Sequence, residues 1–251
     1  DLGLVSTKEP FKKLFNQGMI QGEDGQKMSK SRGNVINPDD VVKDYGADSF
    51  RLYEMFMGPL DKSKPWSTKG LQGCYRFLLK VWRLFNNEEV AIKENCSDEE
   101  TKRLLHQSIK KASDDLDGLR FNTVVSQLMI LTNHLSTLDV LDKDVLHQFL
   151  ILLNPFAPHL SEELNEILGY QPITSMMWPE YDEKLIIDEM ITIAVQFKGK
   201  TRGTIQVAPD TNEKDAMQAV KDTAFGKKYL SLGKIIKVVY IPDKIINIIT
   251  K

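Results

Sequence analysis

The sequence is organised around a basic stretch flanked by glycines, Gly22-Glu23-Asp24-Gly25-Gln26-Lys27-Met28-Ser29-Lys30-Ser31-Arg32-Gly33-Asn34. Its three glycines leave the backbone free to bend, and its polar side chains follow neither a helical nor a strand period. A lysine ammonium on a flexible stem can follow negative charge as it builds on a phosphate, and serine hydroxyls can bind phosphate oxygens or brace the loop. Most loops of this composition are solvated surface loops. A functional interpretation therefore depends on the order of the residues.

The order of the residues indicates a family. The pentapeptide Lys27-Met28-Ser29-Lys30-Ser31 is identical to the signature of class I aminoacyl-tRNA synthetases. Residues 33–48 resemble the leucyl, isoleucyl and valyl subgroup of that class, and residues 73–84 and 195–203 are similar to leucyl-tRNA synthetases in particular. The resemblance runs over nearly the whole chain and indicates the C-terminal part of such an enzyme, beginning just before the pentapeptide. The tail of an isoleucyl- or valyl-tRNA synthetase is the alternative within the class.

The resemblance implies an activity and a set of ligands. Such enzymes use ATP, with Mg²⁺, to activate leucine to leucyl-adenylate, and then transfer the leucyl group to tRNA(Leu). By this resemblance Lys30 and Lys27 are the catalytic candidates, and the pentapeptide as a whole, including Met28, Ser29 and Ser31, is the candidate nucleotide-binding segment. No metal ligands are predicted in this chain.

The class also uses a His-x-Gly-His element, and that element does not occur in this sequence. We therefore expect the chain to be inactive alone and to require an N-terminal catalytic portion, either in cis or as a second subunit. A second hypothesis is a free-standing tRNA-binding module without catalysis of its own.

Composition limits the other possibilities. The chain has 251 residues, of which 41% are hydrophobic, enough to build real cores. Its longest purely apolar run, residues 149–153, is far too short to span a bilayer, and its two cysteines form neither a disulfide framework nor a zinc pattern. These features predict a cytoplasmic protein that does not bind membranes.

Hydrophobic periodicity predicts a multidomain, mainly α fold. An α/β catalytic-domain remnant with the signature loop is expected over residues 1–65, a helical bundle of the anticodon-binding type over 66–185, and a small α+β (ββαββ) domain over 186–251. Within the remnant, apolar residues between Pro10 and Ile20 begin near helical spacing. Further elements are expected as helices at 38–46, 47–57, 69–85 and 212–225, three or four helices within 98–168, and strands at 191–197, 204–207, 235–241 and 245–249.

Charge divides the chain into three segments. Residues 1–83, 84–189 and 190–251 carry net charges of +4, −12 and +6. The acidic middle is a poor host for RNA, which favours a scaffold role for most of the bundle. In the predicted helix at 69–85 a basic stripe lies opposite a broad apolar stripe that includes Trp82, and a basic hairpin is expected at 198–203. These two features supply the candidate tRNA-binding residues Arg76, Lys80, Arg83, Lys198, Lys200 and Arg202.

Overall fold

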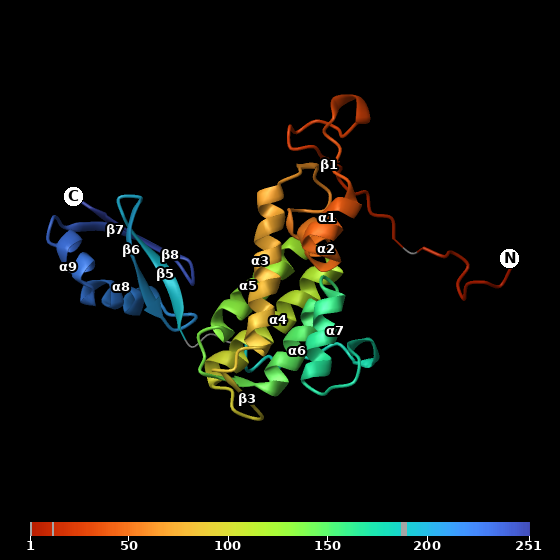
Figure 1. The fold of residues 1–251 in the computed structure, drawn as a ribbon. Helices are drawn as coiled ribbons and strands as arrows, with labels where there is room; N and C mark the ends of the chain where they lie inside the picture. Colours follow the sequence, from red (N-terminus) through yellow and green to blue (C-terminus); the bar gives the residue numbers. More distant parts are fainter. Residues whose placement is uncertain (1, 12, 187–189) are drawn as a thin grey trace. The chain divides into compact units, whose positions relative to one another are not determined.

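A computed structural model describes residues 2–11, 13–186 and 190–251 (Figure 1). Contacts divide the chain into two compact units, Asp1–Ile186 and Ile187–Lys251. This division lies one residue from the boundary predicted between residues 185 and 186. The predicted 1–65 and 66–185 segments fall together in the first unit, so their separation as functional parts stays a prediction.

The first unit is mainly helical, with short strands at its turns. In chain order it contains β1 (Ile20–Gln21), the 3₁₀ helix η1 (Lys30–Arg32), α1 (Pro38–Tyr45), α2 (Ala47–Phe56), β2 (Lys64–Pro65), α3 (Thr68–Phe85), β3 (Ala91–Lys93), α4 (Glu99–Asp117), α5 (Phe121–Leu135), β4 (Val140–Asp142), α6 (Lys143–Leu153), α7 (Pro158–Ile167) and η2 (Ile173–Ser175). The two strand pairs, β1 with β2 and β3 with β4, are both parallel.

The predicted helices of this unit are confirmed, and their ends follow from local chemistry. The Asn37 side chain accepts the Asp39 amide at the start of α1, and the Asp98 side chain accepts the Thr101 amide at the start of α4. Pro158 occupies the first turn of α7, where its missing N–H costs no hydrogen bond, and α6 and α7 are separate helices, so the region predicted to hold three or four helices holds four.

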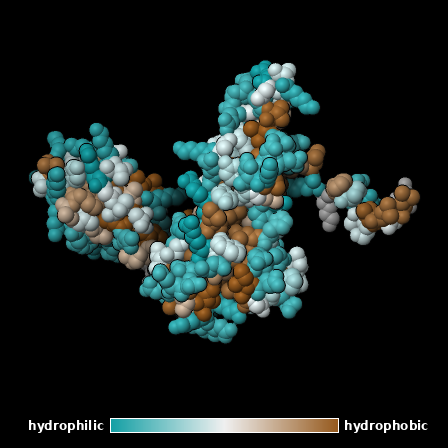
Figure 2. All heavy atoms as spheres, in the orientation of Figure 1, coloured by the Kyte–Doolittle hydropathy of each residue, from teal (hydrophilic) through white to brown (hydrophobic). Residues whose placement is uncertain are grey.

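The near-helical spacing that begins at Pro10 does not correspond to a helix in the described part of the structure. The described residues there form no helix, and the only regular element is β1. Phe11 and Leu14 are 85% and 86% exposed, so no neighbouring surface covers their apolar side chains. A short amphipathic segment without such a surface is not stable as a helix. Figure 2 shows apolar side chains equally uncovered at the N-terminal end of the chain, where Leu2 is 86% exposed.

One continuous core joins α1 to α7. Leu52 of α2, Leu71 and Val81 of α3, Leu128 of α5 and Phe149 of α6 are all buried in it. Trp82 departs from the prediction: it is 38% exposed because it lies beside the buried stripe of α3 rather than within it. None of the helices among the described residues is long and apolar enough to cross a membrane.

The second unit is a four-stranded sheet with two helices. Its elements are β5 (Ile191–Phe197), β6 (Lys200–Val207), α8 (Glu213–Asp222), α9 (Ala224–Leu230), β7 (Ile235–Ile241) and β8 (Ile245–Thr250). The strand order is β6-β5-β8-β7, with β5 and β8 parallel and the outer pairs antiparallel. Ile193, Val195 and Phe197 alternate inward along β5 and are buried with Ile246 and Ile248 of β8.

Two details of this unit differ from the sequence-based expectation. The helix predicted at 212–225 is divided in two, because Thr223 is extended and its side chain caps α9 by accepting the Gly226 amide. The hairpin is also tighter than predicted. Its turn is Lys198–Gly199, with φ of +52° and +76°, the left-handed pair that two-residue hairpins favour. Lys200 therefore belongs to β6, and the order of elements is ββααββ.

Candidate functional site

The signature loop, defined here as residues 22–34, connects β1 to α1. Ile20 pairs with Lys64 in the β1–β2 ladder, and Trp66 donates its amide to the carbonyl of Gln21 at 2.9 Å. The start of the loop is therefore held beside the segment that leads into α3.

Asn34 and Asp24 brace the loop from inside. The Asn34 amide nitrogen donates to both carboxylate oxygens of Asp24 at 3.1 Å, and the Asn34 oxygen accepts the Ser29 amide at 2.9 Å. The backbone amide of Gln26, the Asn34 side chain and the charge of Arg32 together lower the pKa of Asp24 below its usual value. Sequence reasoning named neither residue as part of the site, although both are polar residues that bracket the pentapeptide.

Two glycines allow this compact path. Gly33 ends η1 with φ of +67°, a conformation that glycine adopts without strain. Gly22 is buried, and a Cβ at that position would lie only 2.8 Å from both Asn34 Nδ2 and Asp24 Oδ1. A side chain at Gly22 would therefore displace the Asn34 and Asp24 side chains from this arrangement.

Glu23 ties the loop to the first turn of α3. Its carboxylate accepts the Thr68 hydroxyl at 2.8 Å and the Thr68 amide at 3.2 Å. These two hydrogen bonds lower the pKa of Glu23, the hydroxyl contributing more than the amide. A carboxylate at a helix N-terminus is also favoured by the helix dipole. After Asn34 and Asp24, Glu23 is a third residue that braces the loop and that the pattern of the sequence did not reveal.

Within the pentapeptide the apolar side chain packs on the protein, and the charged side chains are exposed to solvent. Met28 is half-buried and packs against the core, whereas Lys27 and Lys30 are exposed. Ser29 and Ser31 face each other, with their hydroxyl oxygens 3.2 Å apart. Neither lysine forms an ion pair with any residue in the described part of the chain. Two ammonium groups are thus presented to solvent on a short, braced backbone.

The other predicted cations form two separate groups. Arg76, Lys80 and Arg83 lie on α3 and line a cavity of about 460 Å³ in the first unit. Lys198, Lys200 and Arg202 line a cavity of about 290 Å³ in the second unit, which also contains Tyr229. The Arg202 guanidinium carbon lies 5.1 Å from the Tyr229 ring centroid, within cation–π range.

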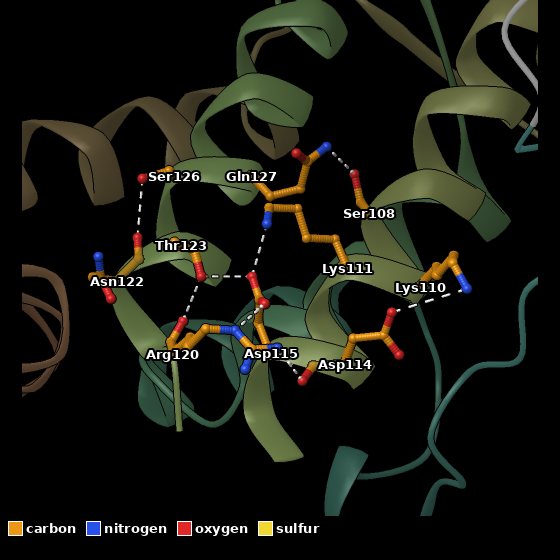
Figure 3. A network of polar contacts seen from close by, with 10 residues as sticks. All are labelled: Ser108, Lys110, Lys111, Asp114, Asp115, Arg120, Asn122, Thr123, Ser126 and Gln127. Atoms are coloured by element: carbon orange, nitrogen blue, oxygen red, sulfur yellow. Dashed lines mark hydrogen bonds and ion pairs between the residues drawn. The ribbon is translucent and has the colours of Figure 1, made fainter. Parts of the chain in front are cut away.

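Charges at the junction of α4 and α5 are arranged differently (Figure 3). The Asp115 carboxylate lies 2.8 Å from Lys111 Nζ and 2.7 Å from Arg120 Nε, and it also accepts the Thr123 hydroxyl. Burial alone would raise the pKa of Asp115, but the hydrogen bonds from Lys111, Thr123 and Arg120 lower it to about 2. In this cluster, called here the Asp115 network, the carboxylate charge is matched by side chains of the protein itself.

Two histidines, His147 and His159, join elements of the fold. His147 is buried, its Nδ1 is 2.8 Å from Asn165 Oδ1, and its ring stacks on Tyr170 at 3.8 Å between centroids. The ring Nδ1 of His159 lies 2.7 Å from Asp48. Asp48 also accepts the Leu160 amide at 2.7 Å, which ties α2 to the start of α7.

Comparison with known proteins identifies relatives of this chain. The chain is 46% identical over its whole length to a leucine–tRNA ligase from Chlorobaculum tepidum, and 48% identical over 99% of its length to one from Leptospira biflexa serovar Patoc. The chain belongs to the leucyl-tRNA synthetase family. It covers 32% and 29% of those two relatives, so it spans about a third of the length of the curated proteins it matches.

Two protein-family models and a solved structure are consistent with membership of the leucyl-tRNA synthetase family. Residues 3–64 match the family described as tRNA synthetases class I (I, L, M and V), and residues 98–217 match the anticodon-binding domain of tRNA ligase. The crystal structure of a ternary complex of an Agrobacterium radiobacter LeuRS with tRNA and LeuAMS is similar, with a TM-score of 0.73 and 32% identity. That match covers the whole of this chain and 35% of the other.

Proposed function

We propose that this chain is the part of a leucine–tRNA ligase that supplies its phosphate-binding loop. The observation that supports the proposal is the exposure of Lys27 and Lys30, both without an ion-pair partner among the described residues, on a loop that Asn34, Asp24 and Glu23 hold in shape. Their ammonium groups suit a polyphosphate, which brings several negative charges to one place. The sequence of this loop is the family's signature, so composition and geometry favour the same ligand.

The reaction proposed is a displacement at phosphorus. A carboxylate oxygen of leucine bonds to the α-phosphorus of ATP while the bond from that phosphorus to the bridging oxygen breaks, which releases pyrophosphate. Negative charge grows on the leaving pyrophosphate, and Lys30, assisted by Lys27, stabilises it. Ser29 and Ser31 maintain the loop, and its glycines allow the lysines to move with the phosphates.

Magnesium in this proposal accompanies the nucleotide. Among the residues that the structure describes, no three His, Cys, Asp or Glu side chains gather as a metal site. The ion would neutralise phosphate charge. The chain's own contribution is the pair of lysines and the braced backbone beneath them.

Pyrophosphate exchange in the intact enzyme tests the role of Lys30. We expect Lys30→Ala to lower exchange by about 10² to 10³, the cost of losing one preorganised donor to developing charge. Lys43→Ala is a matched control, because Lys43 is an exposed lysine on α1 outside the loop. Exchange that stays within a few-fold of wild type in Lys30→Ala rules out the proposed role.

The proposed macromolecular partner is tRNA(Leu). Arg76, Lys80 and Arg83 in one unit, and Lys198, Lys200 and Arg202 in the other, are the proposed contacts. Binding through phosphates releases counterions, so the logarithm of affinity should fall linearly with the logarithm of salt concentration. Removing one contacting cation is expected to reduce that slope by about one.

The two alternatives have clear discriminators. A free-standing tRNA-binding module would bind tRNA but gain no exchange activity when the N-terminal catalytic portion is added, whereas the proposed ligase requires that portion. An isoleucyl or valyl enzyme would charge a different tRNA. The relatives described above are named leucine–tRNA ligases, which favours leucine.

A further inference from the structure

The cavity beside α3 has both a cationic surface and an apolar surface. Binding an RNA backbone requires only the cations. Besides the three cations it is lined by Leu84, Asn87, Val90, Leu135, Ser136, Leu138 and Leu141. Leu84, Leu135 and Leu141 are buried and form an apolar floor. Its volume of about 460 Å³ falls within the range of pockets that hold small organic groups.

The cations of this cavity have no acidic partner among the described residues. Lys80 Nζ donates to Asn133 Oδ1 at 2.7 Å and Arg76 Nε donates to the Gln72 carbonyl at 3.3 Å, and both acceptors are neutral. No ion pair to Arg76, Lys80 or Arg83 is found within the described ranges of the chain. The offsets of four and three residues place all three on one face of α3, a helix without any acidic residue.

Polar groups at the cavity wall can bind a base edge. Ser136 Oγ donates its proton to the Thr132 carbonyl at 2.6 Å, so it has only acceptor capacity left for a ligand. Asn87 Oδ1 accepts the Glu89 amide at 3.1 Å, which leaves the Asn87 amide nitrogen as a donor. The wall thus offers one acceptor and one donor close to the apolar floor.

We propose that this cavity takes one unstacked nucleotide of the bound RNA. Its base lies against Leu84, Leu135 and Leu141, and its flanking phosphates lie against Arg76 and Arg83. A continuous duplex keeps its bases stacked inside the helix and would leave the apolar floor empty, whereas single-stranded loops and bulges offer splayed bases to such pockets. This inference rests on the proposed contact between α3 and RNA, and adds the class of group that enters the cavity.

Cavity-filling variants distinguish a contact with an RNA base from contacts with the RNA backbone. In the intact enzyme, Val90→Trp and Leu138→Trp fill the cavity from two sides and keep all three cations. Ile130→Trp is the control, because Ile130 is 51% exposed on α5 and outside the lining. Binding of a tRNA(Leu) transcript is measured over a salt series, and folding is checked by the thermal midpoint.

We expect each filling variant to raise Kd by about tenfold with an unchanged salt slope, since a base contact is lost and the phosphate contacts remain. Arg83→Ala is expected to reduce the slope by about one, and Ile130→Trp to bind as wild type. Wild-type affinity in either filling variant with a normal midpoint overturns the proposal. If Arg83→Ala still reduces the slope in that case, the backbone contact stands and only the nucleotide pocket fails; if it does not, the contact of α3 with RNA fails as well.

A second experiment, with free mononucleotides, tests whether the cavity binds a nucleotide of RNA or a free nucleotide. Adenosine and cytidine monophosphate, each at millimolar concentration, are expected to leave the wild-type thermal midpoint unchanged, because one nucleotide lacks the anchoring of a whole RNA. A midpoint raised by either compound in wild type but not in Val90→Trp, together with unaltered RNA binding by that variant, assigns the cavity to a free nucleotide and contradicts the proposal.

Discussion

Two charged regions of the first unit are built in opposite ways. In the Asp115 network a buried carboxylate is matched by Lys111, Arg120 and the Thr123 hydroxyl (Figure 3). In the signature loop the hydrogen bonds hold the backbone through Asn34 and Asp24, while Lys27 and Lys30 make no ion pair within the described residues. One region uses charge to join two helices, and the other holds charge ready for a ligand.

The difference teaches where to look for function. A buried charge that the protein itself matches is costly to disrupt, because loss of its partners leaves an uncompensated buried charge. An unmatched cation on an ordered backbone contributes little to stability and is available to an anion. The two regions should therefore respond to mutation in different measurements.

The largest expected effect comes from removing both loop lysines. In the intact enzyme, Lys27→Ala/Lys30→Ala should lower pyrophosphate exchange by about 10³ or more, because each lysine stabilises the same developing charge. Lys27→Ala alone should cost about tenfold, since Lys27 has the assisting role. A double variant no worse than Lys30→Ala alone would remove Lys27 from the proposed mechanism.

Asp115→Ala should act on folding instead. It leaves the Thr123 hydroxyl and two cations without their shared acceptor, and we expect a loss of about 1–3 kcal/mol in the free energy of unfolding. This loss is below the roughly 3–5 kcal/mol usual for breaking a buried ion pair, because Lys111 and Arg120 keep 43% and 54% of their side-chain surface exposed. Urea unfolding measures the change. Asp139→Ala is a suitable comparison, because Asp139 is exposed and belongs to no ion pair among the described residues.

Acid should weaken the Asp115 network in a defined pH window. The folded pKa of Asp115 is about 2, below the usual 3.8, so its contribution is fully present well above pH 3.8 and is lost as the pH falls towards 2. That contribution amounts to about 2 kcal/mol. Urea unfolding between pH 7 and pH 2 should show this loss in wild type, and Asp115→Asn should show a correspondingly smaller pH dependence. Identical pH dependence in the two proteins would mean that Asp115 titrates normally.

The smallest effect concerns the brace of the loop. Asn34→Ala should lower exchange by about tenfold, the scale of one lost hydrogen bond between ordered groups, with little change in unfolding. Asn34→Asp keeps the shape but places a carboxylate against Asp24, so it should be at least as impaired. Full activity in Asn34→Asp would show that the contact between Asn34 and Asp24 does not position the lysines.

Local patterns predicted most of the helical elements. Apolar periodicity, together with residues such as Pro38 at a helix start, marked α1 to α7 because those signals act within one turn of the chain. Tertiary context decided the rest. Residues 10–20 had helical spacing but no surface to cover it, and Thr223 interrupted a helix by capping the next one.

The candidate site could be predicted only in its exposed part. The lysines of the loop follow from the pentapeptide, whereas Glu23 acts through Thr68, which is 45 residues away in sequence. The cavity of α3 likewise depends on Leu135 and Leu141, which come from other elements than the basic stripe. Spacing along one helix does not reveal an apolar floor contributed by its neighbours.

The most direct test measures exchange and unfolding on the same two variants of the intact enzyme. Lys30→Ala should lose exchange by about 10² to 10³ and keep its thermal midpoint, whereas Asp115→Ala should lower the midpoint and keep its exchange rate per folded molecule. Near-normal exchange in Lys30→Ala would contradict the claim that the lysines of the loop bind the nucleotide. A thermal midpoint lowered in Lys30→Ala as far as in Asp115→Ala would contradict it too, because it would mean that the lysine stabilises the fold.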